Sequence, residues 1–241
     1  MLVKKYLNKL SVVYYNLKSI GKSFFVPFVF VYIVIIMLSV CDKLQGFDTY
    51  TCYENTYLKI QFFCPFFAIW WAVFGFREHI EGKCREILLV YKKSILSELL
   101  TVYFLYFINI PILLLLCYIL LELLDVYGLY FINIPVLLIL CNILFQYNYF
   151  NFLFIFFVQS FAFFSFAVSL SVLIKNIALP FIICILYEIF CMTANTELTA
   201  FINMLSVNIP QDTEGILYPY IFIFAGSVIL FVLSNLRFKR L

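Results

Sequence analysis

Long apolar runs separated by short polar clusters dominate this sequence. A helix of about 20 residues crosses the hydrocarbon core of a membrane, and each run is roughly that long. A transmembrane barrel would instead show short strands of alternating polarity. The pattern therefore predicts an all-α, polytopic membrane protein with several candidate spans. These candidate spans cover residues 24–40, 60–76, 99–124, 129–147, 150–174, 177–196 and 217–236.

Composition strengthens this prediction. Hydrophobic residues make up 66% of the 241-residue chain, charged residues only 12%, and 31 residues are Phe. A soluble domain of this length cannot bury so much apolar surface. We therefore expect membrane lipid to be the principal surroundings of the chain.

Basic residues cluster in only some of the polar segments, and this predicts an orientation. The segments after the first run and before the last run are mainly acidic, with Asp42, Asp48 and Glu54 in the first of them. The positive-inside rule then places both termini and the 77–98 loop in the cytoplasm, with the chain in the cell (plasma) membrane. The basic residues are Lys4, Lys5, Lys9, Lys18 and Lys22, then Arg77, Lys83, Arg85, Lys92 and Lys93, then Lys175, and finally Arg237, Lys239 and Arg240.

A duplication complicates the number of spans. The heptapeptide LYFINIP occurs at 105–111 and again at 129–135, and residues 105–120 match residues 129–144 at 13 of 16 positions. If both copies crossed the membrane, Lys175 and the basic C-terminal cluster would be translocated, against the positive-inside rule. We therefore predict six transmembrane helices, with 129–147 a re-entrant or laterally packed segment. Seven spans remain the alternative.

Residues 1–22 have the pattern of an amphipathic helix. Their apolar residues recur at helical spacing, and most of their lysines fall on the other side. Such a helix lies on the membrane surface, with its apolar face in the acyl region and its lysines against anionic headgroups. We expect it to anchor the first span.

The loop at 77–98 also has a helical period. Its charged residues crowd one side, and Glu81 and Arg85 form an i,i+4 pair in the favourable order. A helix with charges of both signs suits either a protein partner or a solvated membrane surface. Its apolar side is made of Ile80, Cys84, Ile87, Leu88, Tyr91 and Ile95.

These features together resemble the permease subunits of ABC type-2 exporters. The resemblance covers the N-terminal basic helix, the external loop after the first span, the pattern E-x-x-E-G-x-x-R-E-I-L at 78–88, and the short basic turn ending SFAVSLSVLIKN at 165–176. It implies six spans and a cytoplasmic coupling helix that docks on a separate ABC ATP-binding subunit. By position, this docking would fall to Glu81, Gly82, Arg85, Glu86 and Ile87.

The resemblance also implies the partners. A second permease subunit, identical or different, completes the transmembrane pathway, and ATP and Mg²⁺ bind to the partner ATPase. The duplicated segment departs from the family pattern. The segment 197–216 suits either the short external helices of the family or an ordinary loop.

The sequence contains few residues for catalysis. Gly21, Lys22 and Ser23 look like the end of a P-loop, but Asn16 occupies the position of its first glycine. His79 is the one histidine, which excludes two-histidine zinc motifs, and no nucleophile elbow is present. We expect no enzymatic activity, bound cofactor, metal site or nucleic-acid partner for this chain.

Glu188 lies near the middle of an apolar run. A carboxyl group at membrane depth is costly, so such a residue is a functional hypothesis by default. Two interpretations stand: a bond across helices, or a position lining the substrate route. On the preceding run, Ala162, Ser165 and Ser169 form a small-residue stripe that favours helix packing.

The cysteines do not predict a disulfide framework, since most lie in apolar runs or face the reducing cytoplasm. Cys41 and Cys52 share the predicted external loop, and a disulfide between them is a hypothesis for an oxidising exterior.

The sequence thus favours the permease subunit of an ATP-driven exporter for an amphipathic peptide, lipid or drug. The alternative is a non-transport sensor or scaffold that uses the 77–98 loop to bind a soluble partner.

Overall fold

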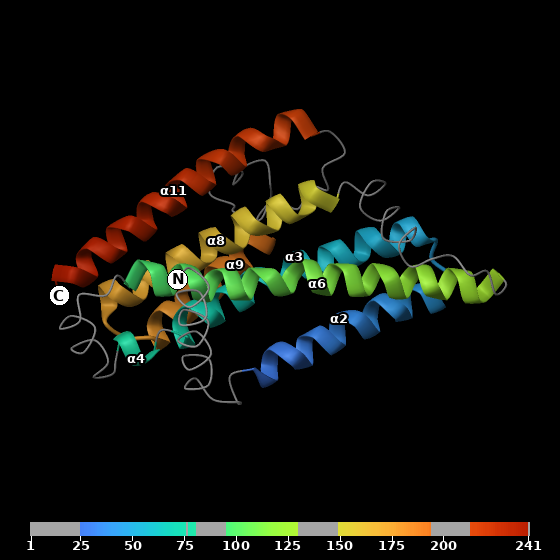
Figure 1. Ribbon diagram of the computed structural model, residues 1–241, viewed down its shortest axis with the longest axis horizontal. Helices are drawn as coiled ribbons and strands as arrows, with labels where there is room; N and C mark the ends of the chain where they lie inside the picture. The colour runs from blue at the N-terminus through green and yellow to red at the C-terminus, as the bar shows by residue number, and fades with distance from the viewer. Residues whose placement is uncertain (1–24, 76, 81–94, 130–148, 194–212, 241) are drawn as a thin grey trace, which may run out of the picture.

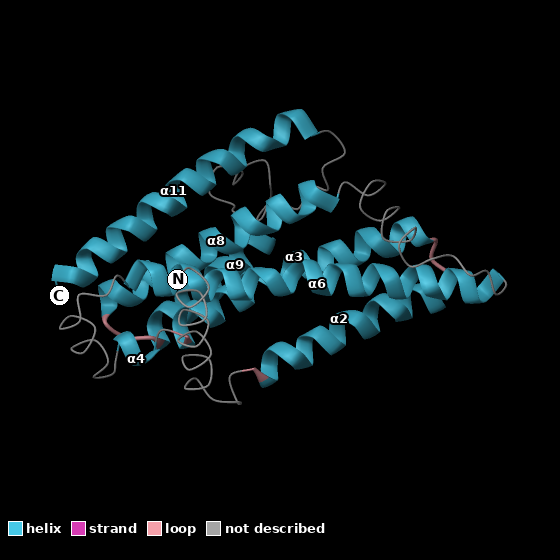
Figure 2. Ribbon diagram, viewed as in Figure 1, coloured by secondary structure: helices cyan, strands magenta, loops and turns pink. Residues whose placement is uncertain are grey.

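The computed structural model describes residues 25–75, 77–80, 95–129, 149–193 and 213–240, and every regular element in these ranges is an α-helix (Figures 1 and 2). The all-α prediction is confirmed for this part of the chain. The helices are α2 (Val26–Leu44), α3 (Thr49–Phe74), α4 (Arg77–Ile80), α6 (Ile95–Leu129), α8 (Tyr149–Ile174), α9 (Ala178–Thr193) and α11 (Thr213–Arg240).

Consecutive long helices run in opposite directions. In Figure 1, α2, α6 and α9 run from left to right, whereas α3, α8 and α11 run from right to left. As a result, α6 finishes and α8 begins toward the same end of the bundle. The finish of α3, the one-turn helix α4 and the finish of α11 all lie toward the opposite end.

Within the described residues, three helices are long and apolar enough to cross a membrane: α3 over Thr49–Phe74, α8 over Leu153–Ile174, and α11 over Tyr220–Arg237. Two shorter apolar stretches, Tyr106–Leu121 and Ala178–Thr193, lie in α6 and α9. Length and apolar composition therefore support a helical membrane protein.

The segment after the first apolar run differs from the prediction. We expected α3 to begin near residue 60, with an external loop before it, but α3 begins at Thr49 and the loop is only four residues long, at 45–48. The Asp48 side chain caps the new start, because its carboxylate accepts hydrogen bonds from the Thr51 hydroxyl at 2.5 Å and the Thr51 N–H at 3.2 Å. These bonds hold the pKa of Asp48 below its ordinary value.

Polar contacts then join this early part of α3 to α2. Lys59 forms an ion pair with Asp42 at 2.5 Å, and the Thr56 hydroxyl donates to Ser39 Oγ at 2.8 Å. The partners in each pair lie 17 residues apart in sequence, so a local sequence pattern does not reveal that they are in contact. The correction therefore comes from tertiary contacts that a hydropathy pattern does not contain.

The core lies around α3 and α8. Helix α8 packs against α3, α6, α9 and α11, and α3 packs against α2, α6, α8 and α9. Aromatic rings fill the junction of α6 and α8, where Tyr103 stacks with Phe107 and meets the edges of Phe157 and Phe161. Such rings provide large contact areas without polar cost.

A short turn fixes the hairpin of α8 and α9. Lys175 follows α8 in the left-handed conformation (φ 58°), and its N–H donates to the Ser171 carbonyl at 2.9 Å. The Asn176 side chain then accepts from the N–H of Ala178 at 2.7 Å and caps α9. This pair of caps produces the short basic turn that the sequence predicted.

Several predicted features lie outside the described residues. These are the surface helix at 1–22, most of the coupling loop at 77–98, the duplicated segment after residue 129, and most of 197–216.

Candidate functional site

The Glu188 carboxyl lies inside the helix bundle. Its side chain is only 3% exposed, and α9 carries it toward α3. One of its oxygens, Oε1, has no hydrogen-bond partner among the described residues. Leaving a buried polar atom without a partner costs free energy, so the position is unusual for a residue that serves packing alone.

The part of α3 that faces Glu188 contains a proline. The carboxyl lies against the backbone of Phe66 and close to the thiols of Cys64 and Cys184. Pro65, inside α3, lacks an N–H and therefore interrupts the hydrogen-bond ladder of the helix at this level. The acid thus sits beside a weak point of a central helix.

A set of three buried polar side chains links helices α3, α8 and α11. The Gln61 side-chain amide on α3 donates to Gln159 Oε1 on α8 at 3.4 Å, and the Gln159 amide donates to the Tyr220 hydroxyl on α11 at 3.3 Å. All three side chains are at most 4% exposed. We call Gln61, Gln159 and Tyr220 the glutamine chain. Both of its bonds are longer than the usual 2.9–3.0 Å.

Tyrosine hydroxyls from α6 extend the polar interior. Tyr103 donates to the Phe157 carbonyl on α8 at 2.8 Å and lies 3.0 Å from Ser160 Oγ. Tyr106 donates to the Cys64 carbonyl on α3. These bonds tie α6 to both central helices, one turn of α3 away from the glutamine chain.

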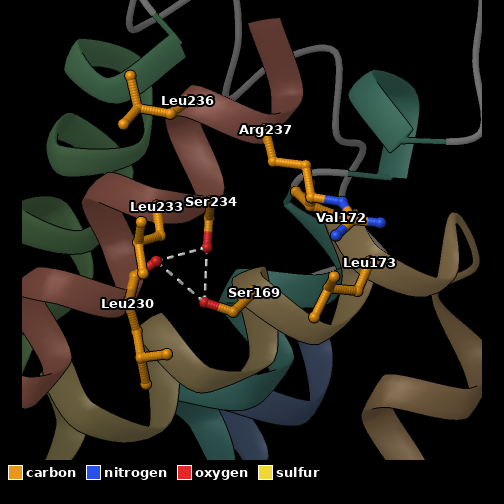
Figure 3. A pocket seen from close by; sticks show the side chains of 8 residues that line it. All are labelled: Ser169, Val172, Leu173, Leu230, Leu233, Ser234, Leu236 and Arg237. Carbon is orange, nitrogen blue, oxygen red and sulfur yellow. Dashed lines mark hydrogen bonds between the residues drawn. The ribbon is translucent and has the colours of Figure 1, made fainter. Parts of the chain in front are cut away.

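The small-residue stripe on α8 serves packing. Ser169 Oγ lies 2.6 Å from Ser234 Oγ on α11 (Figure 3). It also lies 2.7 Å from the Ser165 carbonyl of its own helix. Ala162 and Ser165 are buried as well. The packing interpretation of the stripe is confirmed for Ser169, because small side chains allow α8 and α11 to approach closely.

The other predicted site residues belong to the 77–98 loop. Glu81, Gly82, Arg85, Glu86 and Ile87 lie outside the described residues, so their docking role stays a prediction.

The cysteine hypothesis rested on a shared loop, and that part of it was wrong. Cys41 lies in α2 and Cys52 in α3, and the two residues are not disulfide-bonded. Cys52 is buried and directs its thiol to the Phe47 carbonyl at 3.7 Å. The disulfide stays a hypothesis that a thiol count can test.

Sequence reasoning missed the glutamine chain. The available signal was an amide side chain in the middle of an apolar run: Gln159 within 150–174 and Gln61 within 60–76. At membrane depth an amide side chain, like a carboxyl group, needs a polar partner. The sequence analysis applied this rule to Glu188 and not to the glutamines.

Comparison of this chain with protein-family models, curated proteins and solved structures finds no match. The function must therefore be argued from the chain itself.

Proposed function

We propose that this chain is a multi-pass membrane permease subunit, that six helices cross the cell membrane with both termini in the cytoplasm, and that a separate ATPase drives transport. The observation that carries the proposal is the buried polar interior of an otherwise apolar bundle. Glu188 and the glutamine chain place hydrogen-bonding groups at membrane depth, where groups without a role in transport or signalling are rare.

The helix directions support six crossings. Alternation of α2, α3, α6, α8, α9 and α11 (Figure 1) requires the chain to leave α6 and enter α8 toward the same end of the bundle. A single additional crossing between them would break this alternation. The exposed Arg77, the exposed Lys175 and Arg237 near the finish of α11 all fall toward the opposite end, which agrees with a cytoplasmic face.

The polar interior also supports a transport mechanism. Glu188 is held between α9 and the interrupted part of α3, so a movement of α9 away from α3 would expose the carboxyl to a solute. The long bonds of the glutamine chain would let α11 and α8 shift without losing a strong contact. Such small displacements of packed helices are a common form of conformational switching.

ATP would bind to the partner ATPase and not to this chain. In this proposal, closure of two ATP-binding subunits moves the coupling helix that contains Glu81, Gly82, Arg85, Glu86 and Ile87, and two permease subunits together form the pathway. Amphipathic peptides, lipids and hydrophobic drugs are the substrate classes that an aromatic interior accommodates.

The decisive experiment isolates the chain from its native membrane with its partners. A co-purifying P-loop ATPase whose ATP hydrolysis in proteoliposomes is stimulated by members of a panel of amphipathic peptides and hydrophobic dyes supports the permease. A scaffold or sensor would bind its partner but would show no stimulation by any transported molecule.

The Glu188→Gln substitution tests the site within that assay. The amide preserves size and polarity but removes the ionisable group, so we expect normal abundance and at least a tenfold loss of stimulated hydrolysis, the effect of about 1.4 kcal/mol. The matched control is Glu54→Gln in the outer turn of α3. If Glu188→Gln retains full stimulation, the acid is structural.

The pair Glu81→Lys and Arg85→Glu tests docking. Exchanging both charges keeps the net charge of the loop but reverses its pattern, so we expect loss of ATPase co-purification with unchanged membrane insertion. Exchanging the ion pair of α2 and α3 instead, with Asp42→Lys and Lys59→Asp, provides a control on the other end of the bundle. Full ATPase recovery with the loop variant would contradict the docking assignment.

A further inference from the structure

A cavity of about 720 Å³ opens between the last turns of α8 and α11 (Figure 3). It has no part in the proposed transport route. Its volume falls within the range of about 300–1,000 Å³ that is typical of small-molecule sites. Most of its lining is aliphatic and comes from Val172, Leu173, Leu230, Leu233 and Leu236.

The two hydroxyl groups in the lining are already committed. Ser169 Oγ and Ser234 Oγ lie 2.6 Å apart, so one of them donates to the other, and each also lies 2.7 Å from a backbone carbonyl of its own helix, at Ser165 and Leu230. A serine hydroxyl has one hydrogen to donate, so neither residue has a donor left for a ligand. The wall of the cavity therefore offers an occupant apolar contact and little else.

The mouth of the cavity is cationic. Figure 3 shows the Arg237 side chain reaching from α11 toward Val172 on α8. Arg237 is exposed, and no carboxylate in the described part of the chain pairs with it. A guanidinium group has five N–H donors and suits a phosphate bidentately.

An aliphatic wall below a cationic mouth matches an anionic amphiphile. We propose that this cavity binds one anionic phospholipid from the surrounding leaflet, with its phosphate at Arg237 and an acyl chain along Leu233, Leu230 and Leu173. The proposal rests on the membrane placement argued under the proposed function. Basic pockets between membrane helices bind anionic headgroups in this way. A peptide fits less well, because its backbone would find no free donor in the wall.

The predicted selectivity follows from the donors. Since the serines are occupied, Arg237 is the one charged donor among the described lining residues, and it selects a headgroup by negative charge. The site should therefore distinguish anionic from zwitterionic lipid but accept different anionic headgroups. Because the lipid would contact both α8 and α11, its binding should also stabilise the folded bundle.

The test uses the purified full-length chain without ATPase or substrate. Thermal unfolding is followed in detergent while dioleoyl phosphatidylglycerol or dioleoyl phosphatidylcholine is added. We expect the anionic lipid to raise the midpoint at lower concentration than the zwitterionic lipid. Inorganic phosphate, which has the charge without the acyl chain, should neither raise the midpoint nor compete.

Three variants locate the effect. Arg237→Gln should weaken the apparent affinity for phosphatidylglycerol about fivefold, the contribution of one cation near an anionic surface, and leave phosphatidylcholine unchanged. Leu233→Trp should fill the cavity and weaken both lipids, and the 55% exposure of Leu233 means that the fold tolerates the larger ring. Arg77→Gln, which removes an exposed cation outside the cavity, should change neither.

Two results would overturn the site: equal weakening by Arg237→Gln and Arg77→Gln, or full binding by Leu233→Trp. The outcome is separable from the proposed function. Lipid selectivity without substrate-stimulated ATP hydrolysis would reject the permease and keep the lipid site, whereas stimulated hydrolysis without lipid selectivity would do the reverse.

Discussion

Helices α8 and α11 lie side by side, but they meet very different surroundings. In the most apolar 18-residue stretch of α8, 72% of the residues are buried inside the bundle, compared with 22% in the corresponding stretch of α11. Four helices surround α8, whereas α11 packs chiefly against α8. The inner helix is thus held by protein, and the outer helix presents most of its apolar side chains, such as Phe222 and Ile229, away from the bundle.

The difference shows where polar residues are placed. On α8, buried Gln159, Ser160 and Ser169 point to three different neighbouring helices. On α11, buried polar residues form one stripe of Ser227, Ser234 and Asn235. A polar group is tolerable at membrane depth only where protein can satisfy it, so the number of protein neighbours limits the number of polar faces.

The largest expected effect tests the packing of the two helices. Phe163→Ala in α8 removes a side chain with no exposure, and we expect it to lower the free energy of unfolding by about 3 kcal/mol through the cavity it leaves. Phe222→Ala in α11 removes a side chain that is 76% exposed and should cost no more than about 0.5 kcal/mol. Reversible unfolding in mixed micelles measures the loss of unfolding free energy in each variant. Equal losses would contradict the conclusion that α8 is an inner helix and α11 an outer one.

An intermediate effect concerns the contact between the two helices. A double-mutant cycle of Ser169→Ala and Ser234→Ala should give a coupling of about 0.6 kcal/mol, the average for such bonds in membranes. Ser227→Ala is the matched control on α11, because its hydroxyl donates at 2.6 Å to Ile223 of its own helix. Coupling of Ser169 to Ser227 as strong as to Ser234 would show that the bond between helices contributes nothing specific.

The smallest effect concerns the beginning of α3, the other inner helix. The pKa of Asp48 is lowered by the Thr51 bonds, so its capping is fully present above the ordinary aspartate value of about 3.9. The capping is lost as pH falls through the lower folded value. We expect faster amide hydrogen exchange in the first turn of α3 below about pH 4, while Asp48→Asn should remove this pH dependence. An unchanged pH profile in Asp48→Asn would exclude the cap as its cause.

Sequence patterns located an inner helix well when it contained no charged residue. Helix α8 was predicted at 150–174 and spans Tyr149–Ile174, because its hydropathy falls sharply at both ends. The start of helix α3 was predicted eleven residues too late, since its first turns contain Glu54, Asn55 and Lys59. Lys59 is tolerated there because Asp42 on α2 forms an ion pair with it, and a single sequence contains no record of such a partner.

The candidate site was predictable in part for the same reason. Glu188 stood out as an acid in an apolar run, but its position beside Pro65 depends on how α9 packs on α3. The glutamine chain joins residues 98 and 61 positions apart, and no local period connects them. The presence of an acid in an apolar run predicted a site at Glu188. Only the packing of the helices showed which other residues surround that acid.

The position of α11 along the chain has a consequence for biogenesis. The ribosome releases α8 well before α11, so a nascent chain must hold Gln159 and Ser169 in the bilayer before Tyr220 and Ser234 have been translated. During that interval α8 depends on α3 and α6, or on the insertion machinery, to shield these groups. A premature stop codon ahead of Thr213 would therefore leave a chain whose central helix is permanently uncovered on the side that α11 occupies. Membrane quality-control proteases should remove such a product.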